Sequence, residues 1–167
     1  MRKMTEQNVE AALAGESQAH IKYLAFSEKA AAEKLPNIAR SFKANSFAEQ
    51  VHATNYLKTL AGIGTTAENL AAAVGGETFE VEEMYPAYIK VAELQGEKAA
   101  GISLNAAIAA ERVHAAIYKK AKEALDKGRD LEAKPIHVCS VCGFTMEGDA
   151  PDNCPVCGAP KSKFVMF

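Results

Sequence analysis

The chain has 167 residues, which is enough for one ordinary domain together with a small appendage. Nearly half of the residues are hydrophobic, with many alanines and no tryptophan, a composition that suits closely packed helices. The formal net charge of −2 produces no field that would attract nucleic acid or an anionic membrane. No apolar run is long enough for a transmembrane helix, and the N-terminus leads into an amphipathic pattern rather than an apolar signal core. We therefore expect a cytoplasmic protein.

A first helix is predicted from about residue 5 to residue 33, with Thr5 as its capping residue. Glu16 lies on its inward stripe, two turns before Tyr23. Two interpretations of Tyr23 remain open: an ordinary core aromatic, or a phenol that donates a hydrogen bond or a proton at a metal site. His20 shares the stripe, and we expect it beside a site or at the surface, because Glu16 already supplies that helix's ligand.

A second helix is predicted to begin at Pro36, since a proline at the first helical position loses no hydrogen bond. Its inward stripe is apolar at both ends and polar in the middle, where Glu49 and His52 stand three residues apart. Residues at this spacing share one face of a helix, so the Glu-x-x-His motif points a carboxylate and an imidazole in the same direction. A polar belt in the middle of an apolar stripe is typical of a buried site in a helical bundle.

Glycines bracket the next segment, at Gly62 and Gly64 and at the Gly75-Gly76 pair. They predict a long connection with room for one short helix, and such a connection permits a crossover between helix pairs. A third helix is then expected to begin near Glu77.

The third helix carries two glutamates, Glu77 and Glu80. Tyr85 follows two turns after the first of them, and the same two interpretations are open for it as for the tyrosine of the first helix. Pro86 lacks a backbone N–H and is predicted to bend this helix just beyond the glutamates. A fourth helix is predicted to start between Gly96 and Gly101 and to stop at Gly128, a favourable residue for a helix C-terminus.

The fourth helix carries a second Glu-x-x-His motif, Glu111 and His114. Two such motifs, with one inward Glu from each of two further helices, form the pattern of a ferritin-like dinuclear metal site. Because buried carboxylates without compensation cost several kcal/mol, five that converge need cations. Carboxylates with imidazoles favour iron or manganese over a closed zinc centre, and we choose iron. The competing interpretation is that these are solvated helix residues. The candidate ligands are Glu16, Glu49, His52, Glu77, Glu80, Glu111 and His114.

All four cysteines lie beyond Pro135, as two Cys-x-x-Cys pairs separated by 11 residues. This spacing predicts a tetrathiolate metal site rather than disulfides. A tail this short cannot build a sufficient core, so a bound metal is expected to stabilise it. Zinc ribbons use the same spacing, and the cysteines alone leave structural zinc and redox iron open. A dinuclear iron site in the same chain favours iron. The ligands are Cys139, Cys142, Cys154 and Cys157.

With both sets of motifs in place, the chain resembles the rubrerythrin family over its whole length. The matching stretches are Ala-Gly-Glu16-Ser-Gln-Ala, Ala-Glu49-Gln-Val-His52-Ala, Gly-Glu77-Thr-Phe-Glu80-Val-Glu-Glu-Met84-Tyr85-Pro86, Ala-Glu111-Arg-Val-His114 and Cys154-Pro-Val-Cys157-Gly-Ala-Pro-Lys. The resemblance implies an all-α, four-helix ferritin-like bundle at residues 1–133. A small, β-rich, rubredoxin-like domain would follow at residues 134–167, with one iron ion in the four thiolates, for which zinc can substitute.

The resemblance also implies a role for each ligand of the di-iron site. Glu49 and Glu111 would bridge the two irons. Glu16 would be a terminal ligand of the first iron, and Glu77 and His114 would be ligands of the second. Glu80 and His52 would be alternative ligands of the first iron and would exchange as the site is oxidised or reduced. Tyr23 and Tyr85 are candidate proton donors.

The implied activity is that of a peroxidase that reduces hydrogen peroxide to water in defence against oxidative stress. Electrons would come from NAD(P)H through a reductase or rubredoxin and pass through the tetrathiolate iron. Nucleic acid and membrane are not expected as partners. We expect a homodimer, for which exchange of helix pairs through the glycine-rich connection is one route.

Two alternatives remain beside this interpretation. An iron-oxidising and iron-storing protein with a structural zinc-ribbon tail would use the same generic bundle. A purely structural bundle with a zinc ribbon would leave the inward carboxylates unexplained.

Overall fold

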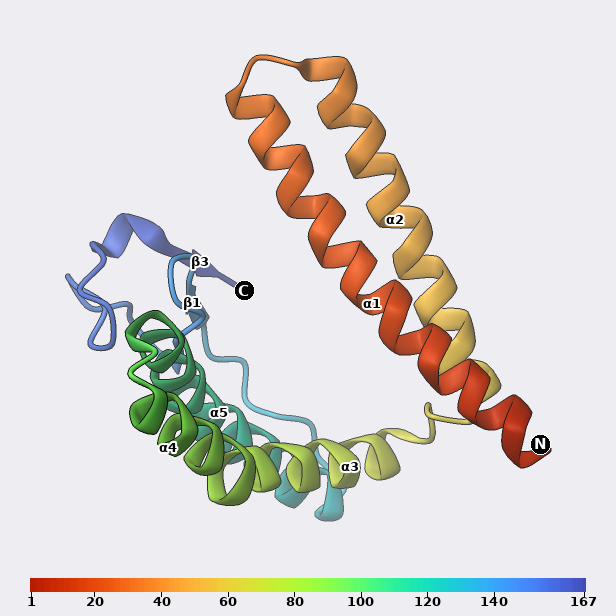
Figure 1. Cartoon of the computed structure of the whole chain (residues 1–167). Helices are drawn as coiled ribbons and strands as arrows, with labels where there is room; N and C mark the ends of the chain where they lie inside the picture. The colour runs from red at the N-terminus through yellow and green to blue at the C-terminus, as the bar shows by residue number, and fades with distance from the viewer. The chain divides into compact units, whose positions relative to one another are not determined.

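A computed structural model describes all 167 residues, and the chain divides into two compact units, Met1–Gly64 and Thr65–Phe167. The first unit contains α1 (Lys3–Ala32) and α2 (Pro36–Thr59), and the second contains all later elements (Figure 1). The boundary expected between residues 133 and 134 separates the helical part from the four-cysteine region. It is not the boundary between these two units, and it stays a prediction. No helix of this chain combines the length and the apolar character that crossing a membrane requires.

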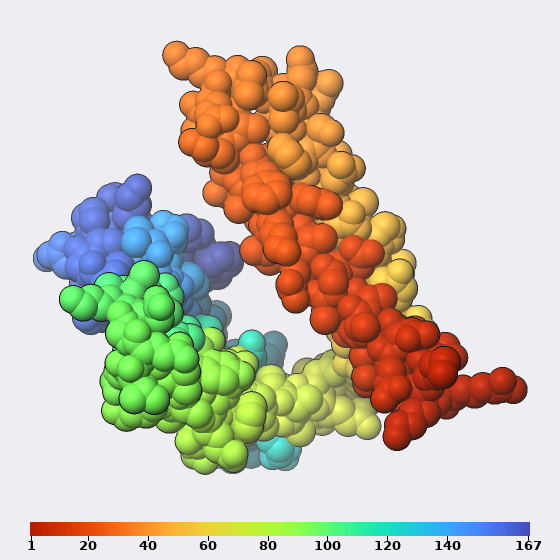
Figure 2. Space-filling model, in the orientation of Figure 1, coloured from red at the N-terminus to blue at the C-terminus, as the bar shows by residue number.

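The first unit is a hairpin of α1 and α2, and Figure 2 shows it as a narrow rod. The predicted start of α2 at Pro36 is confirmed. The predicted cap at Thr5 is wrong: α1 begins at Lys3, its first turn has no side-chain cap, and Thr5 already lies inside the helix. Lys3 and Met4 are good helix formers and extend the helix toward the N-terminus.

Small residues form the contact between α1 and α2. The buried positions of the pair are Ser27, Ala30, Ala39 and Ser46. Large apolar side chains remain outside: Ile21 is 60% exposed and Phe47 is 66% exposed. The first unit by itself therefore has no enclosed core of large side chains.

The helices of the second unit are α3 (Thr66–Phe79), η1 (Glu80–Met84), α4 (Tyr85–Gln95) and α5 (Lys98–Asp126). Thr65 caps α3 in a capping box, in which its hydroxyl accepts from the Glu68 N–H and Glu68 accepts from the Thr65 N–H. The expected break at Gly75-Gly76 is wrong, because α3 runs through both glycines. Each interior glycine costs up to about 1 kcal/mol relative to alanine, so contacts of α3 with α5 outweigh the local preference.

The π-helical turn η1 connects α3 to α4 and begins at Glu80. Its i→i+5 pattern is visible in the bond from the Tyr85 N–H to the Glu80 carbonyl. Pro86 lies in the first turn of α4, where its missing N–H falls at the transition from π to α geometry. The bend predicted at Pro86 stays a prediction, and what the structure shows is a change of helix type that begins at Glu80. Single π turns of this kind occur frequently at functional sites.

The C-terminal region is a three-stranded antiparallel sheet in the order β2-β1-β3. Its strands are β1 (Ile136–Cys139), β2 (Thr145–Glu147) and β3 (Phe164–Met166), with the short 3₁₀ turn η2 (Lys161–Lys163) before the last. Strand β2 contacts α5, and the Lys120 ammonium donates to both carboxylate oxygens of Glu147 at 2.8 Å. A mostly helical chain with a small β-rich C-terminal region is confirmed.

Candidate metal centres

The first unit brings together three of the predicted ligands: Glu16 from α1, and Glu49 and His52 from α2. One ligand atom of each lies within 4.8 Å of the others. The Glu-x-x-His spacing closes as expected, with His52 Nδ1 2.8 Å from Glu49 Oε2. The His52 side chain is 53% exposed, so about half of it is in contact with solvent.

The second unit brings together a matching trio, Glu77 from α3 with Glu111 and His114 from α5. Their ligand atoms also lie within 4.8 Å of one another. His114 Nδ1 is 2.6 Å from Glu111 Oε2 and 3.8 Å from Glu77 Oε2. The His114 side chain is 30% exposed, which makes this cluster the more enclosed of the two.

Carboxylate crowding in the second trio indicates a cation site. Glu77 Oε2 is buried without a hydrogen-bond partner, which is costly for an anionic oxygen. Burial, followed by the neighbouring carboxylate of Glu111, raises the pKa of Glu77 to about 7. A divalent ion among these oxygens and the imidazole would supply the missing partner, and this donor set suits iron or manganese. The residues present therefore fit a metal.

Glu80 begins the π turn and Tyr85 directly follows it, and both lie beside the second trio. Burial, and then the charge of Glu111, raises the pKa of Glu80. The pKa of Tyr85 is also raised, first by burial and then by the Glu111, Glu80 and Glu77 carboxylates. Both side chains thus share the electrostatic environment of the cluster, as expected for residues at its edge.

His114 has a second partner that the sequence did not indicate. Its Nε2 lies 2.7 Å from Thr145 Oγ1, on β2 of the C-terminal sheet. Thr145 is 31 residues away along the chain, and a single threonine after a Cys-x-x-Cys-Gly turn carries no recognisable signal. Only the docking of β2 on α5 brings the two side chains together.

His20 and Tyr23 contribute to packing in the first unit. His20 Nδ1 contacts the carbonyl and the hydroxyl of Ser46 at 2.9 and 3.0 Å, and the Ser46 hydroxyl donates to the His20 carbonyl. His20 therefore connects α1 to α2, in keeping with the expectation that it is not a ligand. The Tyr23 ring packs against Phe26 and Phe42, with ring centroids 6.3 and 6.2 Å away.

The four cysteines form one cluster in the C-terminal region, and none is in a disulfide. Sulfur–sulfur distances are 3.7 Å for Cys139–Cys157 and 3.6 Å for Cys142–Cys154. A tetrahedral ion with metal–sulfur bonds of about 2.3 Å requires edges of about 3.8 Å. The cluster therefore fits a single ion in four thiolates.

The two Cys-x-x-Cys turns share one backbone construction. In the first, the N–H of Gly143 donates to the Cys139 carbonyl at 2.8 Å, and in the second Gly158 donates to Cys154 at 2.8 Å. Both glycines adopt positive φ, at 80° and 74°, which other residues rarely adopt. Each Cys-x-x-Cys-Gly sequence thus folds as a turn that brings two sulfurs to one side.

The thiols differ in acidity because they are crowded together. Burial acts to raise the pKa of Cys139, but hydrogen bonds from the backbone N–H groups of Val141 and Cys142 outweigh it and lower the pKa to about 7. Burial, together with the other thiols, raises the pKa of Cys142 to about 12. A positive ion is needed before all four sulfurs can be thiolates at neutral pH.

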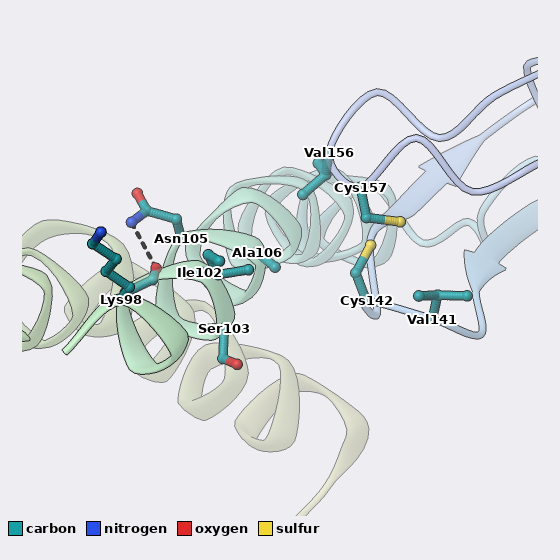
Figure 3. Close-up of a pocket in the computed structure, with 10 residues that line it drawn as sticks. Lys98, Ile102, Ser103, Asn105, Ala106, Val141, Cys142, Val156 and Cys157 are labelled. Atoms are coloured by element: carbon teal, nitrogen blue, oxygen red, sulfur yellow. Dashed lines mark hydrogen bonds between the residues drawn. The ribbon is translucent and has the colours of Figure 1, made fainter.

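One side of the cysteine cluster is accessible. Cys139 and Cys154 are buried, whereas Cys142 is half-buried and Cys157 is exposed. The accessible pair lines an open hollow of about 980 Å³, whose other wall is the first turns of α5, including Ile102 (Figure 3). Val141 and Val156 give this hollow an apolar rim beside the sulfurs.

Comparison with known proteins gives matches for both the helical region and the four-cysteine region. The sequence profile of the family described as Rubrerythrin matches residues 7–122, and that of the rubrerythrin rubredoxin-like domain matches residues 137–165. Rubrerythrin-2 of Clostridium acetobutylicum is 35% identical over 178 residues, covering 98% of this chain and 97% of that protein. Nigerythrin of Nitratidesulfovibrio vulgaris is 33% identical and covers 98% of this chain and 86% of its own length.

Solved structures of nigerythrin also match this chain. The structure described as the partially reduced state of nigerythrin matches with a TM-score of 0.56 at 32% sequence identity, over 98% of this chain and 86% of that chain. The fully reduced, all-ferrous state of nigerythrin matches with the same TM-score and identity.

Proposed function

Because this chain belongs to the rubrerythrin family, we propose that it is a non-haem di-iron peroxidase that reduces hydrogen peroxide to water. The observation that carries the proposal is the pair of matching carboxylate–imidazole trios in a chain that also has a four-cysteine cluster. The overall reaction consumes one hydrogen peroxide, two electrons and two protons and yields two waters. Two ferrous ions, when bound, supply the two electrons that cleavage of the O–O bond requires.

Each predicted ligand keeps its proposed role. Six of the seven candidates belong to the two trios, and the seventh, Glu80, adjoins the second trio. In this proposal Glu80 and His52 exchange as ligands of the first iron, and the π turn supports the exchange, because it places Glu80 where helical geometry changes. A solved relative, nigerythrin, is described in an all-ferrous state, which supports iron as the metal.

Proton delivery is assigned to the tyrosines. A phenol keeps its proton at neutral pH and can donate a hydrogen bond from Oη. Tyr85 lies close enough to the second trio for burial and then the Glu111, Glu80 and Glu77 carboxylates to raise its pKa. Tyr23 lies against two phenylalanines and is the second candidate. The structure therefore supports Tyr85 more strongly than Tyr23.

Electrons are proposed to enter through the cysteine cluster, which holds one iron ion. The reductant is NAD(P)H, acting through a reductase or a rubredoxin. The exposed Cys157 and half-buried Cys142 form the accessible edge of the cluster, and the apolar rim of the adjoining hollow suits a brief protein–protein contact. This arrangement leaves the opposite pair of sulfurs protected from solvent.

The test is an anaerobic assay of peroxide consumption with a reducing partner. We expect Glu80→Ala to lower turnover roughly 10-fold or more, the size of loss seen when groups that tune a metal site are removed. Glu83→Ala is the matched control, because Glu83 is an exposed residue of the same π turn. Unchanged turnover in Glu80→Ala would refute the ligand exchange, and no peroxide consumption by the iron-loaded wild type would refute the peroxidase activity.

We also propose a homodimer that acts in the cytoplasm. Each trio lies wholly within one compact unit, so an exchange of helix pairs between two copies would move a complete trio. Light scattering of the iron-loaded protein tests the dimer, and a monomeric mass at full activity would contradict it.

A further inference from the structure

We propose that Thr145 is a positioning residue for the di-iron site: its hydroxyl fixes the His114 imidazole so that Nδ1 faces the carboxylates. The hydroxyl lies 2.7 Å from His114 Nε2 and donates to the Gly143 carbonyl at 3.1 Å. Thr145 is 4% exposed, so water does not compete for these bonds. The inference rests on the proposed ligand set and is independent of whether peroxide is the substrate.

The direction of each hydrogen bond follows from the number of protons available. A threonine hydroxyl has one proton, and here it is donated to Gly143. Thr145 Oγ1 can therefore only accept from His114, which places a proton on Nε2. The 2.6 Å contact between Nδ1 and Glu111 Oε2 also contains a proton in the metal-free protein, because without one both atoms would be acceptors. A bound metal ion would take the place of that proton on Nδ1, while Nε2 keeps its own proton in the bond to Thr145.

The position of the hydroxyl is itself fixed by the docking of β2. Residues two apart on a strand point to the same face, and Thr145 and Glu147 both face α5. Glu147 pairs with Lys120 through two hydrogen bonds, so the strand is attached to the helix at two points. The Thr145 attachment involves a proposed metal ligand, His114, whereas the Glu147 attachment involves Lys120, which is not a ligand. Substitutions at the two attachments can therefore separate positioning of the imidazole from docking of the strand.

Thr145 also connects the imidazole to the cysteine cluster. Gly143, which accepts the threonine proton, directly follows Cys142 and closes the first cysteine turn by donating to Cys139. A shift in that turn would therefore be transmitted to the ring of His114 through two hydrogen bonds. The same threonine thus makes the geometry of one metal centre depend on the folding of the other.

The test compares Thr145→Val, which keeps the shape and removes the hydroxyl, with Thr145→Ser, which keeps the hydroxyl. The full chain, with its cysteine cluster already filled by zinc, is titrated anaerobically with ferrous ion. We expect Thr145→Val to weaken ferrous binding about 10- to 100-fold, because hydrogen-bond partners of metal-bound histidines have effects of this size. Thr145→Ser should restore the wild-type affinity.

Two controls separate positioning from docking. Glu147→Gln weakens one attachment of β2 but leaves the bond between Thr145 and His114 in place, so it should lower ferrous affinity far less than Thr145→Val does. Isotope-edited NMR of the imidazole nitrogens in zinc-filled protein should show a protonated Nε2 on His114 in the wild type and Thr145→Ser, and a displaced or exchange-broadened signal in Thr145→Val.

Equal losses of affinity in Thr145→Val and Glu147→Gln, or unchanged affinity in Thr145→Val, would overturn the inference. Failure of the wild type to bind ferrous ion at all would refute the ligand set on which it rests. Neither result depends on the peroxidase assay, so the two proposals fail separately.

Discussion

The two trios have the same motif and different surroundings. In both, the histidine Nδ1 approaches the glutamate three residues earlier, at 2.8 Å for His52 and 2.6 Å for His114. Only His114 has a partner for its second nitrogen, the hydroxyl of Thr145. His52 is held at one end and is the more exposed of the two side chains. The same Glu-x-x-His motif therefore gives one fixed and one freer imidazole.

This difference agrees with the roles proposed for the two histidines. A ligand that leaves the metal and returns must rotate, and a ring with one hydrogen bond rotates at lower cost than a ring with two. His52 is the proposed exchanging ligand, and His114 is the proposed permanent one. The contrast between the two trios is therefore open to direct tests.

The largest expected effect separates the two histidines. His114→Ala should weaken ferrous binding by more than about 100-fold, because it removes a ligand for which no other group in its trio substitutes. His52→Ala should weaken it much less, because Glu80 is the proposed alternative ligand. Anaerobic ferrous titration of both variants measures the difference, and equal losses would contradict the division of roles.

The second prediction concerns the pH dependence of the metal-free protein. The raised pKa of Glu77 means that the folded protein binds this proton more tightly than the unfolded chain does. Stability should therefore fall as the pH rises from 4.5 to about 7, by on the order of 2 kcal/mol. Denaturant unfolding at several pH values checks this. Glu77→Gln should flatten the curve, and so should iron, whose charge offsets that of the carboxylates.

A third prediction tests the histidine of the first unit that is not a ligand. Ser46 is 2% exposed and fixes His20 in the way that Thr145 fixes His114. Ser46→Ala should cost about 1 to 3 kcal/mol of unfolding free energy, because it leaves buried polar groups without a partner. Ser17→Ala is the control, since the Ser17 hydroxyl is exposed and bonds only within its own helix. Similar losses for both variants would show that the Ser46–His20 contact is not stabilising.

The smallest effect is expected at the second attachment of β2. Lys120→Met should cost less than about 1 kcal/mol of unfolding free energy, since the Lys120–Glu147 pair is partly exposed and solvent screens it. Thermal unfolding in low and high salt measures the contribution, which should shrink as salt is added. A cost well above this would mean that the ion pair, rather than Thr145, is the main attachment between sheet and helix.

The parts of the molecule that the sequence predicted are those determined by local chemistry. The Glu-x-x-His spacing predicted that Glu49 and His52, and Glu111 and His114, would meet, because three residues nearly complete a helical turn. Pro36 predicted the start of α2 because its ring fixes φ and its nitrogen has no proton to lose. The cysteine spacing predicted one four-sulfur cluster, because each Cys-x-x-Cys-Gly sequence folds as a turn that brings its two sulfurs to one side.

The parts that were missed depend on contacts distant along the chain. Gly75-Gly76 indicated a break, but packing of α3 on α5 keeps the segment helical, and an added Cβ at either glycine would meet nothing within 4 Å. Nothing in this chain's packing explains why glycine occurs there. The bond between Thr145 and His114 requires the sheet to dock on α5, and no local pattern specifies that docking.

The π turn from Glu80 to Met84 has a consequence for how this helix can move. A π turn contains one residue more than the α-helix needs for the same rise, so the chain stores spare length directly at Glu80. Passing that extra residue along the helix shifts one peptide group at a time and leaves both ends in place. In the proposed ligand exchange, such a shift would move the Glu80 carboxylate toward or away from the metal while α3 and α4 stay folded.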